Sequence, residues 1–143
     1  MLRETKQDLI NEAMVLDHFA NKYGAKWTKL GNGAKYRIDA AYQRNGKVVA
    51  WAEVKVYKTK SPFLGVNVPK MIEGCQLALF TGKPFFLLFH HNQRFGMVKI
   101  SDGQQVLSSP KLRIAGGTPP GRKPLGDDIE PMFKYSELDI KWG

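Results

Sequence analysis

Residues 36–57 read YRIDAAYQRNGKVVAWAEVKVY, and the rest of the chain is organised around them. Apolar residues occupy the even-numbered positions in both halves of this stretch, and Arg44-Asn45-Gly46 separates the halves. Such a combination is typical of two antiparallel strands joined by a tight turn. We therefore predict a β-hairpin, with one strand at about residues 35–43 and the other at about 47–58.

The length of the turn decides which side chains share a face. A three-residue loop at 44–46 would place odd-numbered positions of both strands together, whereas a plain two-residue turn would pair odd with even positions. The first register leaves one face almost wholly apolar, so the pattern favours an odd-length loop or a bulge. The even face then carries Tyr36, Ile38, Ala40, Tyr42, Val48, Ala50, Ala52, Val54 and Val56. The odd face carries Arg37, Asp39, Ala41, Gln43, Lys47, Val49, Trp51, Glu53, Lys55 and Tyr57.

Two acids and a lysine meet on the odd face in this register. Asp39, Glu53 and Lys55 project from one side of adjacent strands. Paired carboxylates can hold Mg²⁺ through oxygen ligands, and a nearby lysine can stabilise charge that develops on a phosphate. The hairpin therefore predicts a magnesium site for phosphodiester hydrolysis, in which Mn²⁺ could replace Mg²⁺.

Residues 3–22 form an amphipathic pattern that predicts a helix ending near Gly24. Its apolar arc consists of Leu9, Ala13, Leu16, Phe19 and Ala20. Glu12 falls inside the same arc, where a carboxylate costs free energy unless a cation or hydrogen bonds meet it. Two interpretations stay open: a salt bridge to a nearby lysine, or an additional ligand or base of the predicted site.

The remaining elements follow from shorter signals. We expect a short strand at 26–30, a turn at 31–33 and a largely buried helix at 70–81 after Pro69. The run FFLLF at 85–89 predicts a strand buried on both faces, and 95–100 a further strand. His90 and His91 would point to opposite faces of a strand, which argues against a shared metal ion.

Composition and charge indicate the cellular location of the protein and the class of partner that it binds. The chain has 143 residues, one cysteine and a net charge of +9, which favours a polyanionic partner, nucleic acid first. We find no apolar run of membrane-spanning length and no signal peptide, so we expect no membrane partner and a cytoplasmic location. Residues 1–109 are expected to form the core domain. Residues 110–143 are expected to form a Gly/Pro-rich extension that docks on it.

The order of these features resembles the PD-(D/E)XK nuclease superfamily. A helix with Glu12, then Asp39, then Glu53-Val54-Lys55, then a second helix with Gln76, follows that superfamily's order over residues 3 to about 100. The resemblance implies an α/β, restriction-endonuclease-like fold, with a mixed central sheet flanked by helices and a catalytic hairpin at 36–57. It also implies that Asp39 and Glu53 are the motif acids and Lys55 the catalytic lysine. The residue before Asp39 is Ile38 rather than the proline that many members have.

Further roles follow from the same resemblance. Glu12 matches the first-helix acid of many members, including archaeal-type Holliday junction resolvases, and would join Asp39 and Glu53 as a metal ligand. Gln76 is a weaker match to a second-helix glutamine and completes the predicted catalytic set. Basic residues around the hairpin are candidate contacts to a nucleic-acid backbone. They are Lys35, Arg37, Lys58, Lys60 and Lys70.

The sequence therefore predicts an Mg²⁺-dependent nuclease, an endonuclease or junction resolvase of phage type acting on DNA. If the gene is carried by a phage, the enzyme would act in the host cytoplasm. Two alternatives stay open. One is a non-catalytic nucleic-acid-binding module on the same fold. The other is an RNA-directed nuclease, in which Trp27, Trp51 and Tyr57 could stack unpaired bases. A homodimer is compatible with the sequence, because enzymes that cut both strands often pair two sites.

Overall fold

The computed structural model describes residues 5–30, 37–57, 63–65, 68–100, 132–134 and 140–143. Within these ranges the chain forms two helices and eight strands. In chain order they are α1 (Lys6–Tyr23), β1 (Lys26–Lys29), β2 (Ala40–Arg44), β3 (Lys47–Val56), β4 (Phe63–Gly65), α2 (Val68–Thr81), β5 (Phe85–His91), β6 (Arg94–Ile100), β7 (Met132–Lys134) and β8 (Lys141–Trp142).

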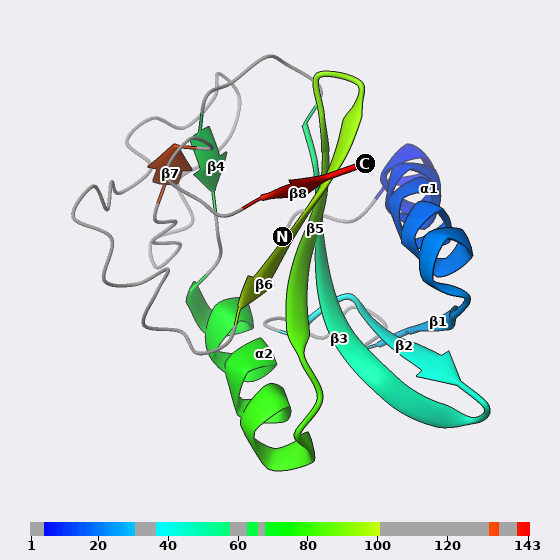
Figure 1. Ribbon diagram of the computed structural model, residues 1–143. Coiled ribbons are helices and arrows are strands. Elements are labelled where there is room, and N and C mark those ends of the chain that lie inside the picture. Colours follow the sequence, from blue (N-terminus) through cyan, green and yellow to red (C-terminus); the bar gives the residue numbers. More distant parts are fainter. Residues whose placement is uncertain (1–4, 31–36, 58–62, 66–67, 101–131, 135–139) are drawn as a thin grey trace.

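The core is one mixed sheet with a helix on each face (Figure 1). Six strands lie in the order β1-β2-β3-β5-β6-β8, and β4 pairs separately with β7. Strands β3 and β5 are parallel, while the other neighbours in the six-stranded sheet are antiparallel. The predicted α/β class, with a mixed central sheet flanked by helices, is confirmed.

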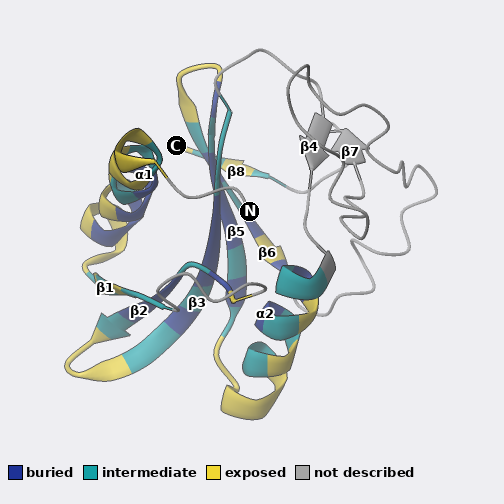
Figure 2. Cartoon of the chain, turned by 180° about the vertical axis from the view of Figure 1, so that it is seen from behind, coloured by how far each residue is buried: buried dark blue, intermediate teal, exposed yellow. Residues whose placement is uncertain are grey.

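Helix α1 is defined at both ends by local signals. The side chain of Thr5 accepts from the backbone of Asp8, the Asp8 side chain accepts from the Thr5 backbone, and Gly24 caps the other end. This capping box starts the helix at Lys6, later than the predicted residue 3. Its buried residues all lie from Glu12 onwards (Figure 2). Leu9 is 42% exposed, so its place in the buried arc was predicted wrongly.

Helix α2 packs on the other face through a narrow stripe. Met71 is fully buried against β5, and Cys75 and Ala78 pack beside it, as expected for a cysteine that acts as a small hydrophobe. Leu79 and Phe80 are 80% and 83% exposed. The expectation of a largely buried helix was therefore wrong, because only one side of α2 faces the sheet (Figure 2).

The hairpin joins β2 and β3 by a two-residue turn and a bulge. Arg44 pairs with Lys47, and Asn45 and Gly46 have positive φ angles of 53° and 75°, as a type I′ turn requires. The register then shifts between Tyr42 and Gln43, so Tyr42 lies opposite Ala50. The three-residue loop was not found, but the bulge that was its alternative is confirmed.

This bulge restores the predicted faces near the site. Even-numbered residues of both strands pack together under α1 in one cluster with Val15, Leu16, Phe19 and Ala20. They are Ala40, Tyr42, Ala50, Ala52 and Val54. Two residues depart from the predicted parity. Val49 joins Ala50 on the α1 face because it lies in the bulge. Ile38 packs on the α2 side, because β2 starts only at Ala40 and the chain has left the ladder there.

Strand β5 forms the buried centre of the sheet. β5 lies between β3 and β6, and Phe85, Leu87, Leu88 and Phe89 are buried, which confirms the predicted central strand. β8 pairs with β6, and so residues 141–142 dock on the core. The boundary at 109/110 falls outside the described residues and stays a prediction. No helix in the described part of the chain is both long and apolar enough to cross a bilayer.

Candidate active site

Asp39 and Glu53 lie side by side where β2 begins, beside β3. Ala40, the first residue of β2, pairs with Ala52, which places the residue before β2 next to Glu53. The backbone N–H of Val54 donates to Asp39 Oδ2 at 2.8 Å. The Asp39 carboxylate therefore occupies the ladder position before Ala40, so the β2 ladder begins only after it. Because the side chain replaces a backbone acceptor, its position is fixed by the sheet itself.

Glu53 is a buried carboxylate with incomplete partners. It is 2% exposed, and its Oε1 atom makes no hydrogen bond within the described part of the chain. Burial raises the pKa of Glu53 well above its usual value, and the negative charge of Asp39 raises it further, although Lys70 and Lys55 oppose the shift. Two adjacent carboxylates of this kind are stabilised by a bound cation, so the donor set fits a divalent metal ion.

Lys70 supplies a cation from the first turn of α2. Its Nζ atom lies 3.2 Å from Glu53 Oε2 and 4.0 Å from Asp39 Oδ1. Burial alone would lower the pKa of this ammonium group, but the Glu53 and Asp39 carboxylates raise it. We predicted Lys70 as a surface contact to a nucleic-acid backbone. The structure places its ammonium group against the two acids, and a contact with nucleic acid stays a prediction.

A cleft of about 230 Å³ connects these groups with α1. Val54, Val56 and Lys55 of β3 line it together with the acid pair and Lys70. The α1 side is contributed by Asp8, Asn11 and Glu12. Asp39, Glu53 and Lys55, which the parity argument placed together, thus border a single cleft, and Glu12 faces them from the opposite wall.

Glu12 forms the salt bridge that one of its two interpretations required. Its Oε2 atom lies 3.4 Å from Lys29 Nζ, and the residue is 8% exposed. Among the residues that the structure describes, no three His, Cys, Asp or Glu side chains are grouped closely enough to hold a metal ion. Glu12 therefore lines the cleft without forming a three-carboxylate cluster with Asp39 and Glu53, and its role as a third ligand stays a prediction.

Glu73 holds the chain segment that leads into Asp39. Its Oε2 atom accepts from the Ile38 N–H at 3.1 Å, and its Oε1 atom lies 3.6 Å from Arg37 Nε. Arg37, a predicted nucleic-acid contact, is thus paired with an acid at the surface, where such a pair contributes little stability. The bond to Ile38 matters more, because it fixes the backbone next to a residue of the acid pair.

Replacing Glu73 by alanine should therefore make the backbone next to Asp39 less well fixed. We expect the free energy of unfolding to fall by about 1–2 kcal/mol, because the hydrogen bond to a charged acceptor is lost. Glu73→Gln, whose amide oxygen still accepts from Ile38, should restore most of that stability. Urea denaturation of the three proteins measures the effect. Equal losses in both variants would show that the bond to Ile38 is not what Glu73 contributes.

Other predicted site residues lie elsewhere. Gln76 is exposed on α2 and does not line the acidic cleft, so the structure does not bring it to the acids. Lys35, Lys58 and Lys60 lie outside the described residues. Trp51 donates to Thr81 Oγ1 at 2.9 Å and packs against the α2-side core, while Trp27 donates to Asp17 Oδ1 at 2.7 Å. Both indoles therefore have structural partners.

Two lysine contacts to the acids of the site were not predicted. Lys70, which lines the cleft, lies 3.2 Å from Glu53, and Lys29, which does not, lies 3.4 Å from Glu12. A signal existed for Lys29, since a buried acid at Glu12 required a nearby cation. No comparable signal existed for Lys70, because its contact depends on how α2 docks on the sheet.

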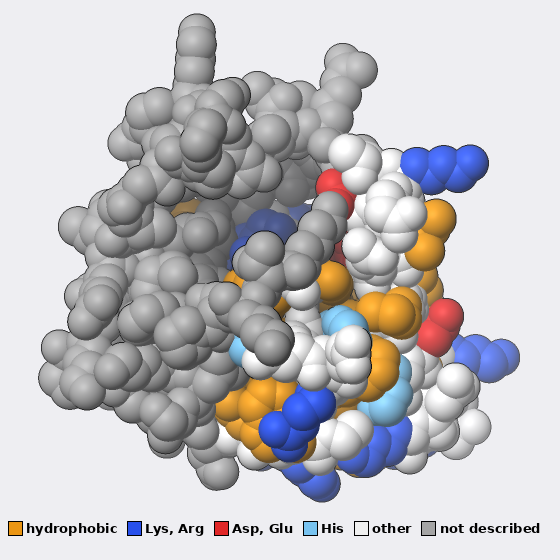
Figure 3. Space-filling model, turned by 90° about the horizontal axis from the view of Figure 1, so that it is seen from above, with side chains coloured by type: hydrophobic (Ala, Val, Ile, Leu, Met, Phe, Trp, Pro, Cys, Tyr) orange, Lys and Arg blue, Asp and Glu red, His pale blue; other side chains and the backbone are white. Residues whose placement is uncertain are grey.

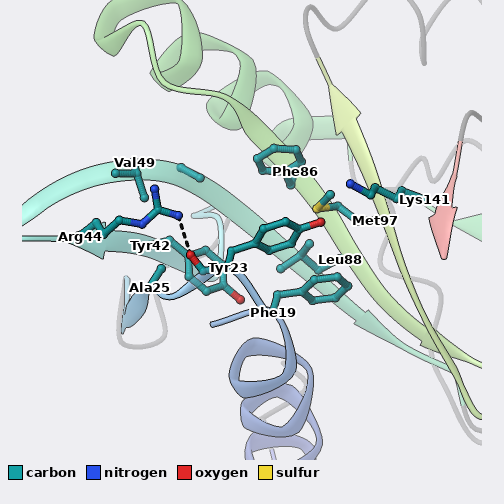
Figure 4. A pocket seen from close by; sticks show the side chains of 11 residues that line it. Phe19, Tyr23, Ala25, Tyr42, Arg44, Val49, Phe86, Leu88, Met97 and Lys141 are labelled. Carbon is teal, nitrogen blue, oxygen red and sulfur yellow. Dashed lines mark hydrogen bonds between the residues drawn. The ribbon is translucent and has the colours of Figure 1, made fainter. Parts of the chain in front are cut away.

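A second, larger cavity lies on the α1 side of the sheet, and it has a different character. It measures about 280 Å³, and aromatic and aliphatic side chains dominate its wall (Figure 4). Arg44 at its rim donates to the carbonyl of Tyr23 at 2.7 Å. None of the described residues that line this cavity carries a carboxylate. The smaller acidic cleft is therefore the candidate active site, although it is not the larger hollow.

Lys and Arg side chains lie at several separate places on the face drawn in Figure 3, with apolar side chains between them. Among the described residues on this face, the basic side chains therefore form no single patch.

Comparisons with known proteins agree with this geometry. Residues 2–141 match a family model described as phage putative PDDEXK endonuclease. The fold is similar to the solved structure of Hjc, a Holliday junction resolvase from the archaeal hyperthermophile Archaeoglobus fulgidus, with a TM-score of 0.58. That match covers 90% of this chain and 89% of the other at 13% identity, which shows a shared fold. No curated protein sequence matches the chain. Because the family model spans nearly all of its residues, the protein belongs to the phage PDDEXK endonuclease family.

Proposed function

We propose that the protein is a Mg²⁺-dependent DNA endonuclease whose active site is the cleft between α1, β3 and α2. One observation supports this proposal above all. Glu53 is 2% exposed beside Asp39, and its Oε1 atom makes no hydrogen bond to any described residue. A fold that buries a carboxylate in this way carries a free-energy cost that a bound cation removes. Membership of the endonuclease family agrees with such a site.

Asp39 and Glu53 would hold the ion, which would supply a polarised water and neutralise charge on the phosphodiester. Lys55 borders the same cleft two residues after Glu53, where its ammonium can donate to a phosphate oxygen. Asp39 keeps its orientation because the Val54 N–H holds Oδ2. Glu12, across the cleft, can accept a hydrogen bond from a water that enters between the two walls.

A cleavage assay tests the proposal directly. Purified protein is incubated with supercoiled plasmid, a four-way DNA junction, single-stranded DNA and RNA of the same sequence, each with Mg²⁺, Mn²⁺ or EDTA. We expect DNA cleavage that requires the divalent ion and is lost in Lys55→Met. Lys83→Met is the matched control, since Lys83 is an exposed lysine that does not line the cleft.

Each alternative function predicts a different pattern. Salt-dependent DNA binding without turnover under any ion condition would identify a non-catalytic module. Cleavage of RNA alone would identify an RNA-directed enzyme. Cleavage that is undiminished in Lys55→Met would contradict the role assigned to this lysine. A preference for the junction over the plasmid would identify a resolvase among the DNA-cutting possibilities.

A homodimer and a cytoplasmic site of action belong to the same proposal. Leu79 and Phe80 expose 80% and 83% of their surface on α2, which supports an apolar contact with a second copy. Two copies would also bring two sites to the two strands of a duplex. Sedimentation equilibrium gives the oligomeric state, and a monomer at all concentrations would remove the dimer from the proposal.

A further inference from the structure

Lys70 occupies the position of a counter-ion between the two acids. Its Nζ atom is 3.2 Å from Glu53 Oε2 and 4.0 Å from Asp39 Oδ1, and 28% of its side chain is exposed. The ammonium group thus contacts the acids, while part of the lysine side chain is exposed to solvent. Because α2 begins at Val68, this lysine lies in the first turn of the helix, directly beside the cleft.

Lysines already compensate part of the negative charge of the cleft without a metal ion. Lys70 contacts Glu53 and Asp39, and Lys55 lines the same space. Lys29 contacts Glu12 without lining the cleft, and Asp8 adds a fourth carboxylate to the lining. A divalent ion at the acid pair would add two positive charges within a few ångströms of the Lys70 ammonium. Like charges so close in a partly buried site repel strongly, so both cations are unfavourable on the same carboxylates.

We propose that Lys70 is an exchangeable counter-ion, which neutralises Asp39 and Glu53 before metal binding and moves to a backbone phosphate of the nucleic acid when a divalent ion binds the pair. This inference rests on the proposed function, because it assumes that the acid pair holds a metal ion. The long, flexible stem of lysine allows the ammonium to leave the acids while the helix stays in place. Lys55 and Lys70 would then hold the substrate from two sides of the cleft.

The exchange makes Lys70 a direct reporter of metal binding. Without metal, its amine is engaged with two carboxylates and should react slowly with an acylating reagent. With Mg²⁺ bound, the released amine should react several-fold faster. Lys47 and Lys83, which are exposed and do not line the cleft, should react at unchanged rates and serve as internal controls.

The experiment combines metal titration with lysine footprinting on the full chain in the absence of nucleic acid. Isothermal titration calorimetry first establishes that the wild-type protein binds Mg²⁺ or Mn²⁺. Acetylation at increasing Mg²⁺ is then followed for each lysine by peptide mass spectrometry. We expect the Lys70 rate to rise with the same midpoint as the calorimetric titration. Metal binding with an unchanged or reduced Lys70 rate would overturn the exchange. Absence of metal binding would instead remove the proposed function on which it rests.

Replacing Lys70 tests separately its contact with the acid pair and its contact with a backbone phosphate. Lys70→Met should bind the metal ion roughly 5- to 150-fold more tightly at pH 8.5, the usual range of coupling between two ligands that affect one another. With Ca²⁺ bound in place of Mg²⁺, the variant should bind DNA with a salt-dependence slope smaller by about one. Lys83→Met should change neither quantity. Weaker metal binding in Lys70→Met, or an unchanged salt slope, would contradict the proposal.

Discussion

Replacing Glu53 by glutamine is expected to reduce DNA cleavage by about 10³-fold, the cost of losing one group that stabilises transition-state charge. Glutamine has nearly the same shape as glutamate but cannot supply the negative charge that a metal ion requires. Glu53 is 2% exposed, so the glutamine amide would stay buried beside Asp39. The measurement is single-turnover cleavage of plasmid DNA with Mg²⁺, together with calorimetric titration of the metal ion.

The same variant should be more stable than the wild-type protein without metal. The pKa of Glu53 is raised in the folded state, first by burial and then by Asp39. The folded protein therefore binds the Glu53 proton more tightly than the unfolded chain does, and stability falls as pH rises above the ordinary value of 4.5. Because glutamine does not titrate, Glu53→Gln removes this pH-dependent loss of stability. Its stability advantage in EDTA should be small near pH 4.5 and grow towards pH 8.

Asp17→Asn is the control for this pair of effects. It also neutralises one carboxylate, but on the exposed side of α1, and its amide oxygen can still accept from Trp27 Nε1. We expect near-normal cleavage and no gain in stability with pH. If Glu53→Gln kept substantial cleavage, or lost stability relative to wild type at pH 8 in EDTA, the assignment of Glu53 as a strained metal ligand would be wrong.

Replacing Gly74 by valine is expected to lower the free energy of unfolding by about 3 kcal/mol. A Cβ atom at Gly74 would lie only 2.4 Å from two ring atoms of Phe85, and Phe85 is fully buried. Neither partner can move without disturbing the α2-side core. The absence of a side chain at Gly74 lets α2 approach β5 closely, and α2 carries Lys70 to the cleft and Glu73 to the Ile38 N–H.

Three further variants make this expectation specific. Gln76→Val introduces the same β-branched residue at an exposed position of the same helix and should cost about 0.5 kcal/mol from helix propensity. Combining Gly74→Val with Phe85→Leu should cost less than the sum of the two single changes, because the smaller side chain relieves the collision. Urea denaturation measures these three, Gly74→Val and the wild-type protein. Strict additivity would show that the Gly74–Phe85 contact is not the source of the loss.

The order of elements and the acid pair could be read from local patterns. Periodicity predicted both helices, the hairpin and the central strand, because each pattern reflects burial of one face of a regular element. The even face of the hairpin had to be apolar, and side-chain alternation then required a bulge or an odd loop. The bulge next to Tyr42 fulfils this requirement, and it puts Asp39 beside Glu53.

Contacts between elements that are distant in sequence were decided by the tertiary structure. β2 was expected from residue 35 but starts at Ala40. The Val54 N–H donates to the Asp39 side chain, and the Ile38 N–H donates to the Glu73 side chain, so neither joins the strand ladder. Leu9 and Phe80 looked like core residues, yet the sheet does not reach them.

The sequence by itself determined the fold class, the two acids and the lysine that follows them, since these depend on strand alternation and element order. Only the tertiary structure decided that Lys70 contacts the acids and that Gln76 does not line the cleft. The physical reason is that helical periodicity defines which residues of α2 share a face, but not how that face turns against the sheet. That rotation is fixed by close packing at Gly74 and Met71.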